Sequence, residues 1–173
     1  MIYFISDTHF YHENVIKYSK RPFNSIEDMN NYIVKKWNEV VSPNDTVYHL
    51  GDFSLGSDNE NKEIFNRLNG NIILVRGNHD EKSAKYYENI GFIVLTHAPI
   101  VIDKYKIVLS HKPVPDGKIP TDYINIHGHI HNKKLNDEYD SRFYSCDKHI
   151  NVSVDVTNYK PVSLDEIKCK VKD

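Results

Sequence analysis

The chain has 173 residues, and its 22 basic and 24 acidic side chains leave a net charge of −2. A chain of this length typically folds as one domain, so we expect a single domain over residues 1–173. The near-neutral charge excludes a broad nucleic-acid-binding surface, which needs a clear excess of Lys and Arg, although a local basic patch remains compatible with it.

The first residues, MIYFISDTHF, contain a short apolar run with no basic residue before it and an aspartate at its end. This pattern predicts neither a signal peptide nor a membrane span, and we expect a cytoplasmic protein with no membrane partner. The two cysteines, Cys146 and Cys169, are too few for a disulfide framework, so we expect both to be reduced.

Strands and helices alternate in the first half of the predicted structure. Residues 2–5 form a short apolar β-prone run, and residues 13–20 read as a short helix that ends before Pro22. Ser25 is a predicted N-cap for a helix over 26–41, which has apolar residues at helical spacing. The remaining elements of this half are a strand at 46–50, a helix at 59–68, a strand at 72–76 and a helix at 82–89.

Strands follow one another in the second half, with candidates at 92–95, 100–103, 106–110, 123–126, 143–146 and 150–154. The first half is typical of βαβ units with a parallel sheet, whereas the second half is typical of a meander. We therefore expect a mixed α/β (α+β) fold: two mixed sheets packed face to face and flanked by helices, a four-layer α-β-β-α sandwich.

Histidine is the unusual feature of the composition, with 10 residues against 2 cysteines and 2 methionines. Several histidines lie in polar clusters that directly follow predicted strands. These clusters are Asp7-Thr8-His9, Gly51-Asp52, Gly77-Asn78-His79-Asp80, His111 and His127-Gly128-His129-Ile130-His131. Sites form where the carboxyl ends of strands meet, so we expect these side chains to converge. Asp7 and His9 are spaced i, i+2, as are His129 and His131, and in extended chain each pair would point to one side.

The converging donors are carboxylates, an amide and imidazoles, with no thiolate. Such a set suits Mn²⁺, Fe, Zn²⁺ or Ni²⁺ and does not suit a structural thiolate zinc site. The donors are too numerous for one ion. Two ions roughly 3.5–4 Å apart are a standard device for in-line attack on phosphorus. As an alternative, Asp7 and Asp52 could be simple turn formers, but turns do not account for the ordered series of clusters.

The ordered blocks D-x-H, G-D, G-N-H-D, a lone H and G-H-x-H resemble the signature of the calcineurin-like metallophosphoesterase superfamily, and the resemblance spans residues 1 to about 160. The chain further resembles the small, uncapped bacterial and phage-type members in the stretches S-D-T-H-F, Arg21-Pro22-Phe23, Y-H-L-G-D-F and N-Y-K-P-V-S-L-D-E-I.

The resemblance implies a role for each motif residue. Asp7, His9 and His131 would hold one metal ion, Asn78, His111 and His129 would hold the other, and Asp52 would bridge the two ions. A hydroxide between the ions would be the nucleophile. His79 would donate a hydrogen bond or proton during the reaction, and Asp80 is a weaker candidate for orienting His79. Two divalent ions are the expected cofactors, with Mn²⁺ favoured.

Substrate contacts are less specific in the sequence. Arg21 and Arg76 are the best candidates, because a guanidinium group matches two phosphate oxygens, although Arg76 could also point away from the site. His12 either touches substrate or is a solvated residue at the start of a helix. His49 reads as a satisfied strand residue, and His97 and His149 are assigned to the surface.

The expected reaction is hydrolysis of a phosphate ester, and a phosphodiesterase acting on a small nucleotide-like substrate is favoured. A short nucleic acid is a further candidate partner. Protein phosphatases carry the pattern G-D-Y-V-D-R-G at the second block. This chain departs from that pattern at Gly51-Asp52-Phe53, which argues against a protein phosphatase. A broad phosphomonoesterase is the second hypothesis, and a non-catalytic scaffold on the same fold is the third. The oligomeric state is not predicted.

Overall fold

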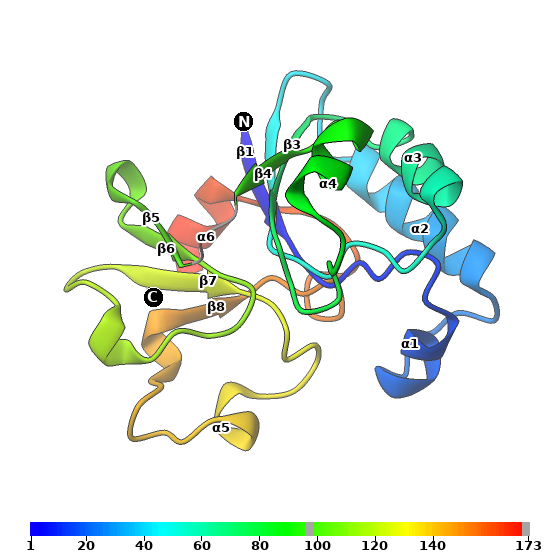
Figure 1. The fold of residues 1–173 in the computed structure, drawn as a ribbon. Coiled ribbons are helices and arrows are strands. Elements are labelled where there is room, and N and C mark those ends of the chain that lie inside the picture. The colour runs from blue at the N-terminus through cyan, green and yellow to red at the C-terminus, as the bar shows by residue number, and fades with distance from the viewer. Residues whose placement is uncertain (96–98, 171–173) are drawn as a thin grey trace.

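A computed structural model describes residues 1–95 and 99–170, and its strands form two sheets (Figure 1). His97 lies outside the described residues. The larger sheet has the strand order β4-β3-β2-β1-β9, and the smaller sheet has the order β5-β6-β7-β8. The strands are β1 (Ile2–Ile5), β2 (Thr46–His49), β3 (Asn71–Val75), β4 (Ile93–Leu95), β5 (Ile100–Ile102), β6 (Ile107–Leu109), β7 (Ile124–His127), β8 (His149–Asn151) and β9 (Val162–Ser163). The α-helices are α1 (Glu13–Tyr18), α2 (Ile26–Asn38), α3 (Asp58–Asn66), α4 (Ala84–Ile90), α5 (Leu135–Glu138) and α6 (Leu164–Lys170).

Parallel strands form the centre of each sheet. Strands β1 to β4 are parallel and β9 is antiparallel to β1, while β6 to β8 are parallel and β5 is antiparallel to β6. The two sheets join where β1 and β8 end, because the backbone N–H of Ser6 donates to Val152 (3.0 Å) and the N–H of Val154 donates to Ser6 (3.1 Å). The carboxyl ends of both sets of parallel strands therefore meet.

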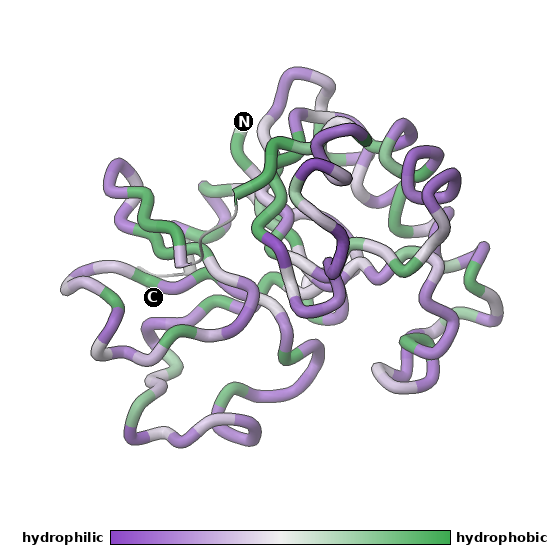
Figure 2. Tube along the Cα trace, in the orientation of Figure 1, coloured by the Kyte–Doolittle hydropathy of each residue, from purple (hydrophilic) through white to green (hydrophobic). Residues whose placement is uncertain are grey.

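Side chains alternate across the larger sheet and so contribute to two hydrophobic cores. In β1, Tyr3 and Ile5 pack with Met29, Ile33 and Trp37 of α2 in the core beneath the helices. Phe4 faces the other way, into the core that β6 and β7 share with the larger sheet. Figure 2 shows that the hydrophobic segments lie along the strands of both sheets. The predicted class, two packed mixed sheets flanked by helices, is confirmed.

The outer face of the smaller sheet is covered mainly by an irregular segment. Val108 of β6 packs against Val114 and Ile119, which flank a 3-10 turn at Asp116–Lys118. Val114 donates its N–H to the Asn125 side chain (2.9 Å), so the buried polar groups beneath this segment are satisfied.

Helix boundaries follow the capping residues. Ser25 accepts a hydrogen bond from the N–H of Asp28 (3.0 Å), as expected of an N-cap, and α2 ends at Asn38, earlier than predicted. Helix α3 starts at Asp58 because Ser57 and Glu60 form a capping box.

The predicted strand at 143–146 is wrong, because this segment forms a turn followed by a 3-10 turn at Cys146–Lys148. Phe143 is 57% exposed, and the N–H of Ser145 donates to the carboxylate of Asp116 instead of to a neighbouring strand. The prediction also omitted the short elements α5, β9 and α6. Among the described residues, no helix has the length and apolar character needed to cross a membrane.

Candidate metal centre

The predicted ligands converge at the junction of the two sheets, and most of them have unusual backbone conformations. Positive φ angles between 49° and 71° occur at Asp7, His9, Asp52, His129 and His131. The expectation that the i, i+2 pairs lie in extended chain is therefore wrong. Non-glycine residues rarely adopt this left-handed conformation, and such strain is typical of functional sites.

One group of donors consists of Asp7, His9 and His131, which each place one donor atom within 4.8 Å of the others. Asp7 is fully buried, and both of its carboxylate oxygens accept a hydrogen bond from the N–H of His129 (3.2 and 3.0 Å). Burial raises the pKa of Asp7, and the charges of His111 and His131 oppose this effect. Burial also lowers the pKa of His9 well below its usual value, which leaves the imidazole neutral and able to coordinate a metal.

A second group consists of Asp52, His111 and His129, whose donor atoms also lie within 4.8 Å of one another. The Nε2 atom of His111 is 3.2 Å from Nδ1 of His129 and 2.9 Å from the amide oxygen of Asn78. Burial first, and then the charges of His111 and Lys112, lower the pKa of His129 to about 4. The structure thus brings all seven predicted ligands together.

Asp52 belongs to the second group but also faces the first. Its Oδ2 atom is 3.6 Å from Nε2 of His9 and 3.4 Å from Nε2 of His111, and its Oδ1 atom accepts from the N–H of His79 (2.8 Å). Burial on its own raises the pKa of Asp52, but the hydrogen bond and charge of His111 and the charge of His9 hold that pKa below its usual range. One anionic oxygen therefore faces both groups of donors.

These residues fit two divalent cations. The Nε2 atom of His9 is buried without a hydrogen-bond partner, although buried polar atoms are normally satisfied. The donor set combines imidazole nitrogens with carboxylate and amide oxygens, which suits first-row divalent metals. A cation held by the first group would give the orphaned nitrogen of His9 a partner.

The other ring nitrogens of two predicted ligands are fixed by neighbouring groups. Nδ1 of His131 lies 2.7 Å from the carboxylate of Asp155, and Nδ1 of His111 lies 2.8 Å from the backbone oxygen of Leu50. Bonds of this kind orient the ring and leave Nε2 facing the centre. Asp155 was not predicted to be a site residue. It directly follows the strand predicted at 150–154, so the rule that site residues come just after predicted strands also applies to it.

Arg21 does not contact substrate as predicted, because its guanidinium group is enclosed in the protein. It forms a two-point ion pair with Asp155 (2.8 and 2.9 Å) and donates to the backbone oxygens of Thr8 (2.9 Å) and Asp7 (2.7 Å). The Arg21 side chain is 0% exposed. Arg21 thus holds the D-x-H loop in place from beneath.

Replacement of Asp155 by Asn is expected to lower the free energy of unfolding of the metal-free protein by about 3–5 kcal/mol, because it leaves the charge of Arg21 buried without its counterion. Urea unfolding in EDTA measures this. The matched control is Asp140→Asn, which removes an exposed partner of Arg142 and should change stability by less than about 1 kcal/mol. Equal effects of the two substitutions would contradict the role assigned to Asp155.

The ion pair between Arg21 and Asp155 predicts that the stability of the fold depends on pH. Burial alone raises the pKa of Asp155, but His131 and Arg21 outweigh burial and lower that pKa to about 2. Its contribution to stability is therefore full above the usual carboxyl pKa and is lost as the pH falls toward 2.

Three glycines allow the motif loops to approach the carboxylates. A Cβ atom on Gly77 would lie within 3.0 Å of the Asp52 side chain, and one on Gly128 would overlap the side chains of Ser6 and Asp7. Gly51 combines φ +92° with close contacts to Gly77 and His111. The backbone at these positions is packed directly against the candidate metal centre.

We expect Gly128→Ala to weaken binding of the metal held by Asp7 by at least tenfold, because the added methyl group displaces the carboxylate. Gly117→Ala is the control, since a Cβ atom there meets no atom within 4 Å. Titration of the metal-free variants with Mn²⁺ by calorimetry compares the two, and wild-type affinity in Gly128→Ala would contradict the expected packing.

His79 and His12 lie at the surface of the centre. The His79 ring is exposed and lies 5.4 Å from the His9 ring and 6.1 Å from the His12 ring, measured between centroids. His12 also places Nδ1 at 3.3 Å from Nδ1 of His9. Both imidazoles line a cavity of about 240 Å³ together with His9 and His131.

The predicted role of Asp80 needs correction. Its buried carboxylate accepts hydrogen bonds from the N–H groups of Asp52 (2.7 Å), Phe53 (3.0 Å) and Gly77 (2.8 Å). It therefore ties two motif loops together and does not orient the His79 ring, because side chains adjacent in the chain point to different sides. Arg76 donates to the backbone oxygen of Asp80 (2.6 Å) and lines a cavity of about 340 Å³ with Asn78, His111 and Lys112.

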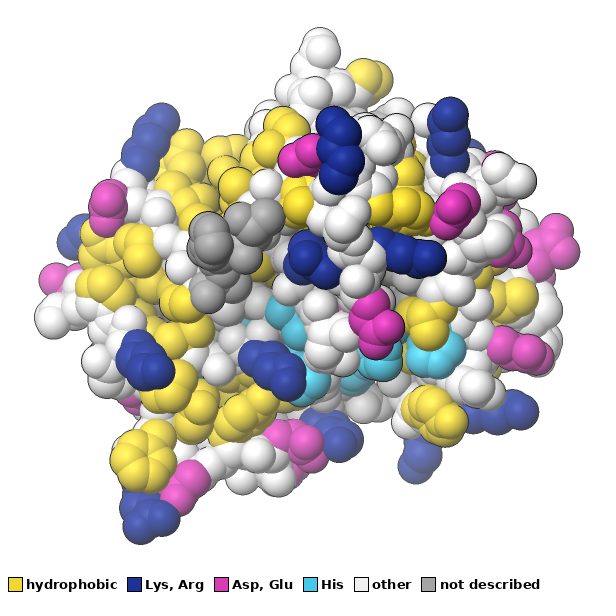
Figure 3. Space-filling view, in the orientation of Figure 1, with side chains coloured by type: hydrophobic (Ala, Val, Ile, Leu, Met, Phe, Trp, Pro, Cys, Tyr) yellow, Lys and Arg dark blue, Asp and Glu magenta, His cyan; other side chains and the backbone are white. Residues whose placement is uncertain are grey.

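The histidines outside the ligand set are mostly internal. His49 is buried, with Nε2 at 3.0 Å from Thr8 Oγ1 and Nδ1 accepting from Gly51, as expected for a satisfied strand residue. His127 is also buried. The prediction for His149 is wrong, because its side chain is only 2% exposed and lies against Asp116. Figure 3 shows histidine side chains gathered at the centre of one face, with basic side chains around them.

Comparison with known proteins shows the family. The sequence model of calcineurin-like phosphoesterases matches residues 1–162. The chain belongs to the calcineurin-like phosphoesterase family. The order of the five motif blocks and the two groups of candidate ligands are consistent with this membership.

Relatives of this calcineurin-like protein occur in archaea, phage and bacteria. An uncharacterised protein of Methanocaldococcus jannaschii is 45% identical to this chain, and the match covers 96% of this chain and 88% of that protein. The gene 66 protein of Mycobacterium phage L5 is 27% identical, and the match covers 95% of this chain and 91% of that protein. A crystal structure of an Aquifex aeolicus protein of unknown function matches with TM-score 0.71, 33% identity and 98% coverage of both chains. A nuclease of Pseudomonas putida shares the fold, with a TM-score of 0.50 and 20% sequence identity. The match covers 75% of this chain and 61% of the nuclease chain.

Proposed function

We propose that the protein hydrolyses phosphodiesters of nucleotide-like substrates with two divalent cations, of which Mn²⁺ is favoured. The observation that carries the proposal is the position of Asp52, whose Oδ2 atom lies within 3.6 Å of an imidazole from each donor group. Asp7, His9 and His131 would hold one ion, Asn78, His111 and His129 would hold the other, and Asp52 would contact both. Bound cations would supply positive charge to the phosphoryl oxygens and lower the pKa of a coordinated water.

His79 is the residue that we assign to proton or hydrogen-bond donation. Its ring is exposed beside the donor groups, and only its backbone N–H contacts Asp52. An imidazole at such a position can donate to a phosphoryl or leaving-group oxygen. His12, in the same cavity, is a candidate for substrate contact.

A diester is favoured over a monoester because the candidate centre opens on two sides. His9 and His131 of the first group border one cavity. His111 of the second group borders another, together with Asn78, Arg76 and Lys112. The two ester arms of a phosphodiester could each occupy one cavity. Arg76 and Lys112 would favour an additional anionic group, as a nucleotide chain carries. The Pseudomonas putida nuclease indicates that the fold is compatible with phosphodiester cleavage.

Turnover of bis-p-nitrophenyl phosphate and p-nitrophenyl phosphate in Mn²⁺ tests the proposal. We expect a higher kcat/KM for the diester. Preference for the monoester would favour the alternative of a broad phosphomonoesterase, and absence of turnover for both substrates in every divalent metal would favour a scaffold on this fold.

A further inference from the structure

A cavity of about 660 Å³ lies outside the candidate metal centre, between α2, the loop that precedes it and a turn near the end of the chain. Its lining residues are Pro22, Phe23, Asn24, Asp28, Asn31, Tyr32, Lys35, Asn158 and Tyr159. None of the predicted metal ligands lines it. Its volume falls in the range of cavities that bind small molecules.

Three aromatic rings form the apolar part of this cavity. The centroids of Phe23 and Tyr159 are 5.0 Å apart, those of Phe23 and Tyr32 are 5.4 Å apart, and those of Tyr32 and Tyr159 are 5.7 Å apart. The ring planes meet at angles of 55° to 81°, so none of these rings is covered by a parallel neighbour from this set. All three side chains are partly exposed, so a planar ring that stacks on one of them would meet the other two at its edges.

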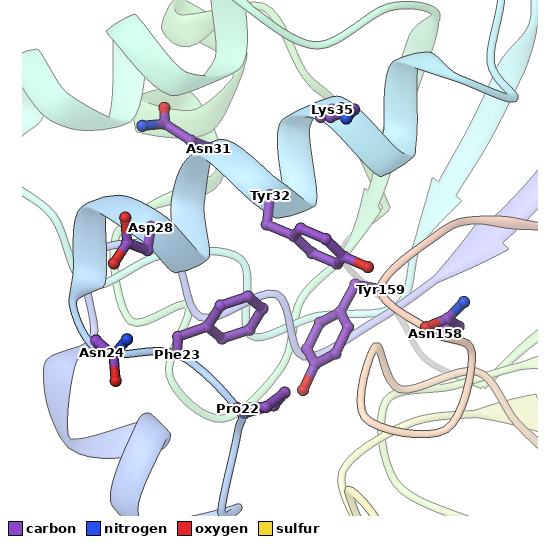
Figure 4. A pocket seen from close by; sticks show the side chains of 9 residues that line it. All are labelled: Pro22, Phe23, Asn24, Asp28, Asn31, Tyr32, Lys35, Asn158 and Tyr159. Atoms are coloured by element: carbon purple, nitrogen blue, oxygen red, sulfur yellow. The ribbon is translucent and has the colours of Figure 1, made fainter.

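Polar groups on α2 give the cavity two chemically different ends. Asp28, Asn31, Tyr32 and Lys35 have the spacing i, i+3, i+4, i+7 and so share one face of the helix. Asp28 and Lys35 are separated by roughly 10 Å along the helix axis, given a rise of about 1.5 Å per residue. Figure 4 shows Asp28 toward the start of the helix, Lys35 toward its end, and the three rings grouped beside it.

The turn that supplies Tyr159 has an unfavourable backbone. Asn158 has φ 55° and Tyr159 has φ 60°, a conformation that a tyrosine rarely adopts. The inner part of Tyr159 packs against the hydrophobic core, and persistent backbone strain of this kind is typical of ligand sites. This turn and Phe23 come from two stretches noted in the sequence, neither of which supplies a metal ligand.

We propose that this cavity binds a purine nucleotide. The base would stack on the ring of Tyr32 and contact Phe23 and Tyr159 at its sides, and its hydrogen-bond-donating edge would face the carboxylate of Asp28. The amide of Asn158 carries both donors and an acceptor, as the edge of a purine requires, whereas the amide oxygen of Asn31 already accepts from Arg67 (2.5 Å). The phosphate would lie at Lys35, which forms no ion pair within the described residues, whereas its neighbour Lys36 is paired with Glu39 (2.7 Å).

Calorimetric titration of the full chain in EDTA with guanosine 5′-monophosphate tests the proposal, because binding is then measured without metal ions or turnover. We expect one molecule to bind per chain. Tyr32→Leu keeps an apolar side chain but removes the ring, and Lys35→Gln removes the charge; each should weaken binding by about tenfold or more, the scale of one base–aromatic or phosphate contact. Lys62→Gln is the control and should bind as the wild type does, because Lys62 is an exposed lysine of α3 that does not line the cavity. Lys36 is unsuitable as a control, since its Nζ atom lies 5.8 Å from the centroid of the Tyr32 ring.

The outcomes separate this proposal from the proposed hydrolysis. Absence of binding at millimolar nucleotide, or equal affinity of Lys35→Gln and Lys62→Gln, would overturn it whether or not the protein hydrolyses diesters. Guanosine should bind Lys35→Gln and the wild type equally, because it has no phosphate. A guanine oligonucleotide that binds more tightly than the mononucleotide would identify the ligand as part of a chain, and equal affinity would identify it as a free nucleotide.

Discussion

Replacement of Asp52 by Asn is expected to remove both metal ions together and to abolish hydrolysis. The substitution keeps the size of the side chain and the oxygen that accepts from the N–H of His79, but it removes the negative charge that faces His9 and His111. If the carboxylate is shared, neither ion retains its affinity when that charge is lost. We expect metal affinity to fall by at least a hundredfold at both positions.

Elemental analysis after gel filtration in Mn²⁺, together with turnover of bis-p-nitrophenyl phosphate, measures this effect. Asp140→Asn serves as the control, because Asp140 is exposed and pairs only with Arg142 among the contacts described. Two fully occupied metal positions in Asp52→Asn would contradict a bridging role. Loss of one ion alone would assign Asp52 to a single group.

His79→Ala is expected to lower kcat by about 10²- to 10⁴-fold while metal binding stays unchanged. The imidazole ring of His79 belongs to neither donor group, and the contact of this residue with Asp52 is made by its backbone N–H, which the substitution retains. The effect should therefore appear in turnover and not in metal content.

The comparison variant is His12→Ala, which removes another imidazole from the same cavity. Because His12 is assigned to substrate contact, we expect its loss to raise KM more than it lowers kcat. Activity of His79→Ala near that of the wild type would show that the role of donor belongs to another group.

The position of the site could be predicted because the candidate metal ligands follow the ends of predicted strands. Asp7, Asp52 and His111 each come directly after an apolar β-prone run, and parallel strands bring such residues to one edge. The capping serine Ser25 was likewise visible in local sequence. These features depend on neighbours in the chain, which a single sequence displays.

What escaped prediction depends on contacts between distant segments. Arg21 was assigned to phosphate, but its partner Asp155 lies 134 residues away, and nothing local indicates that the pair is buried. The left-handed backbone at Asp7 and His9 is accompanied by hydrogen bonds from their N–H groups to the backbone oxygens of Gly51 and Asp52, which are distant in the sequence. The failure at residues 143–146 has a similar cause, since the side chain of Asp116 takes the N–H of Ser145 that a strand would have used.

An anomalous-scattering map of crystals grown in Mn²⁺ would show directly whether Asp52 is shared by two metal ions. We expect two peaks, one among Asp7, His9 and His131 and one among Asn78, His111 and His129, with the Asp52 carboxylate between them. A single peak, or two peaks of which neither contacts Asp52, would contradict this expectation.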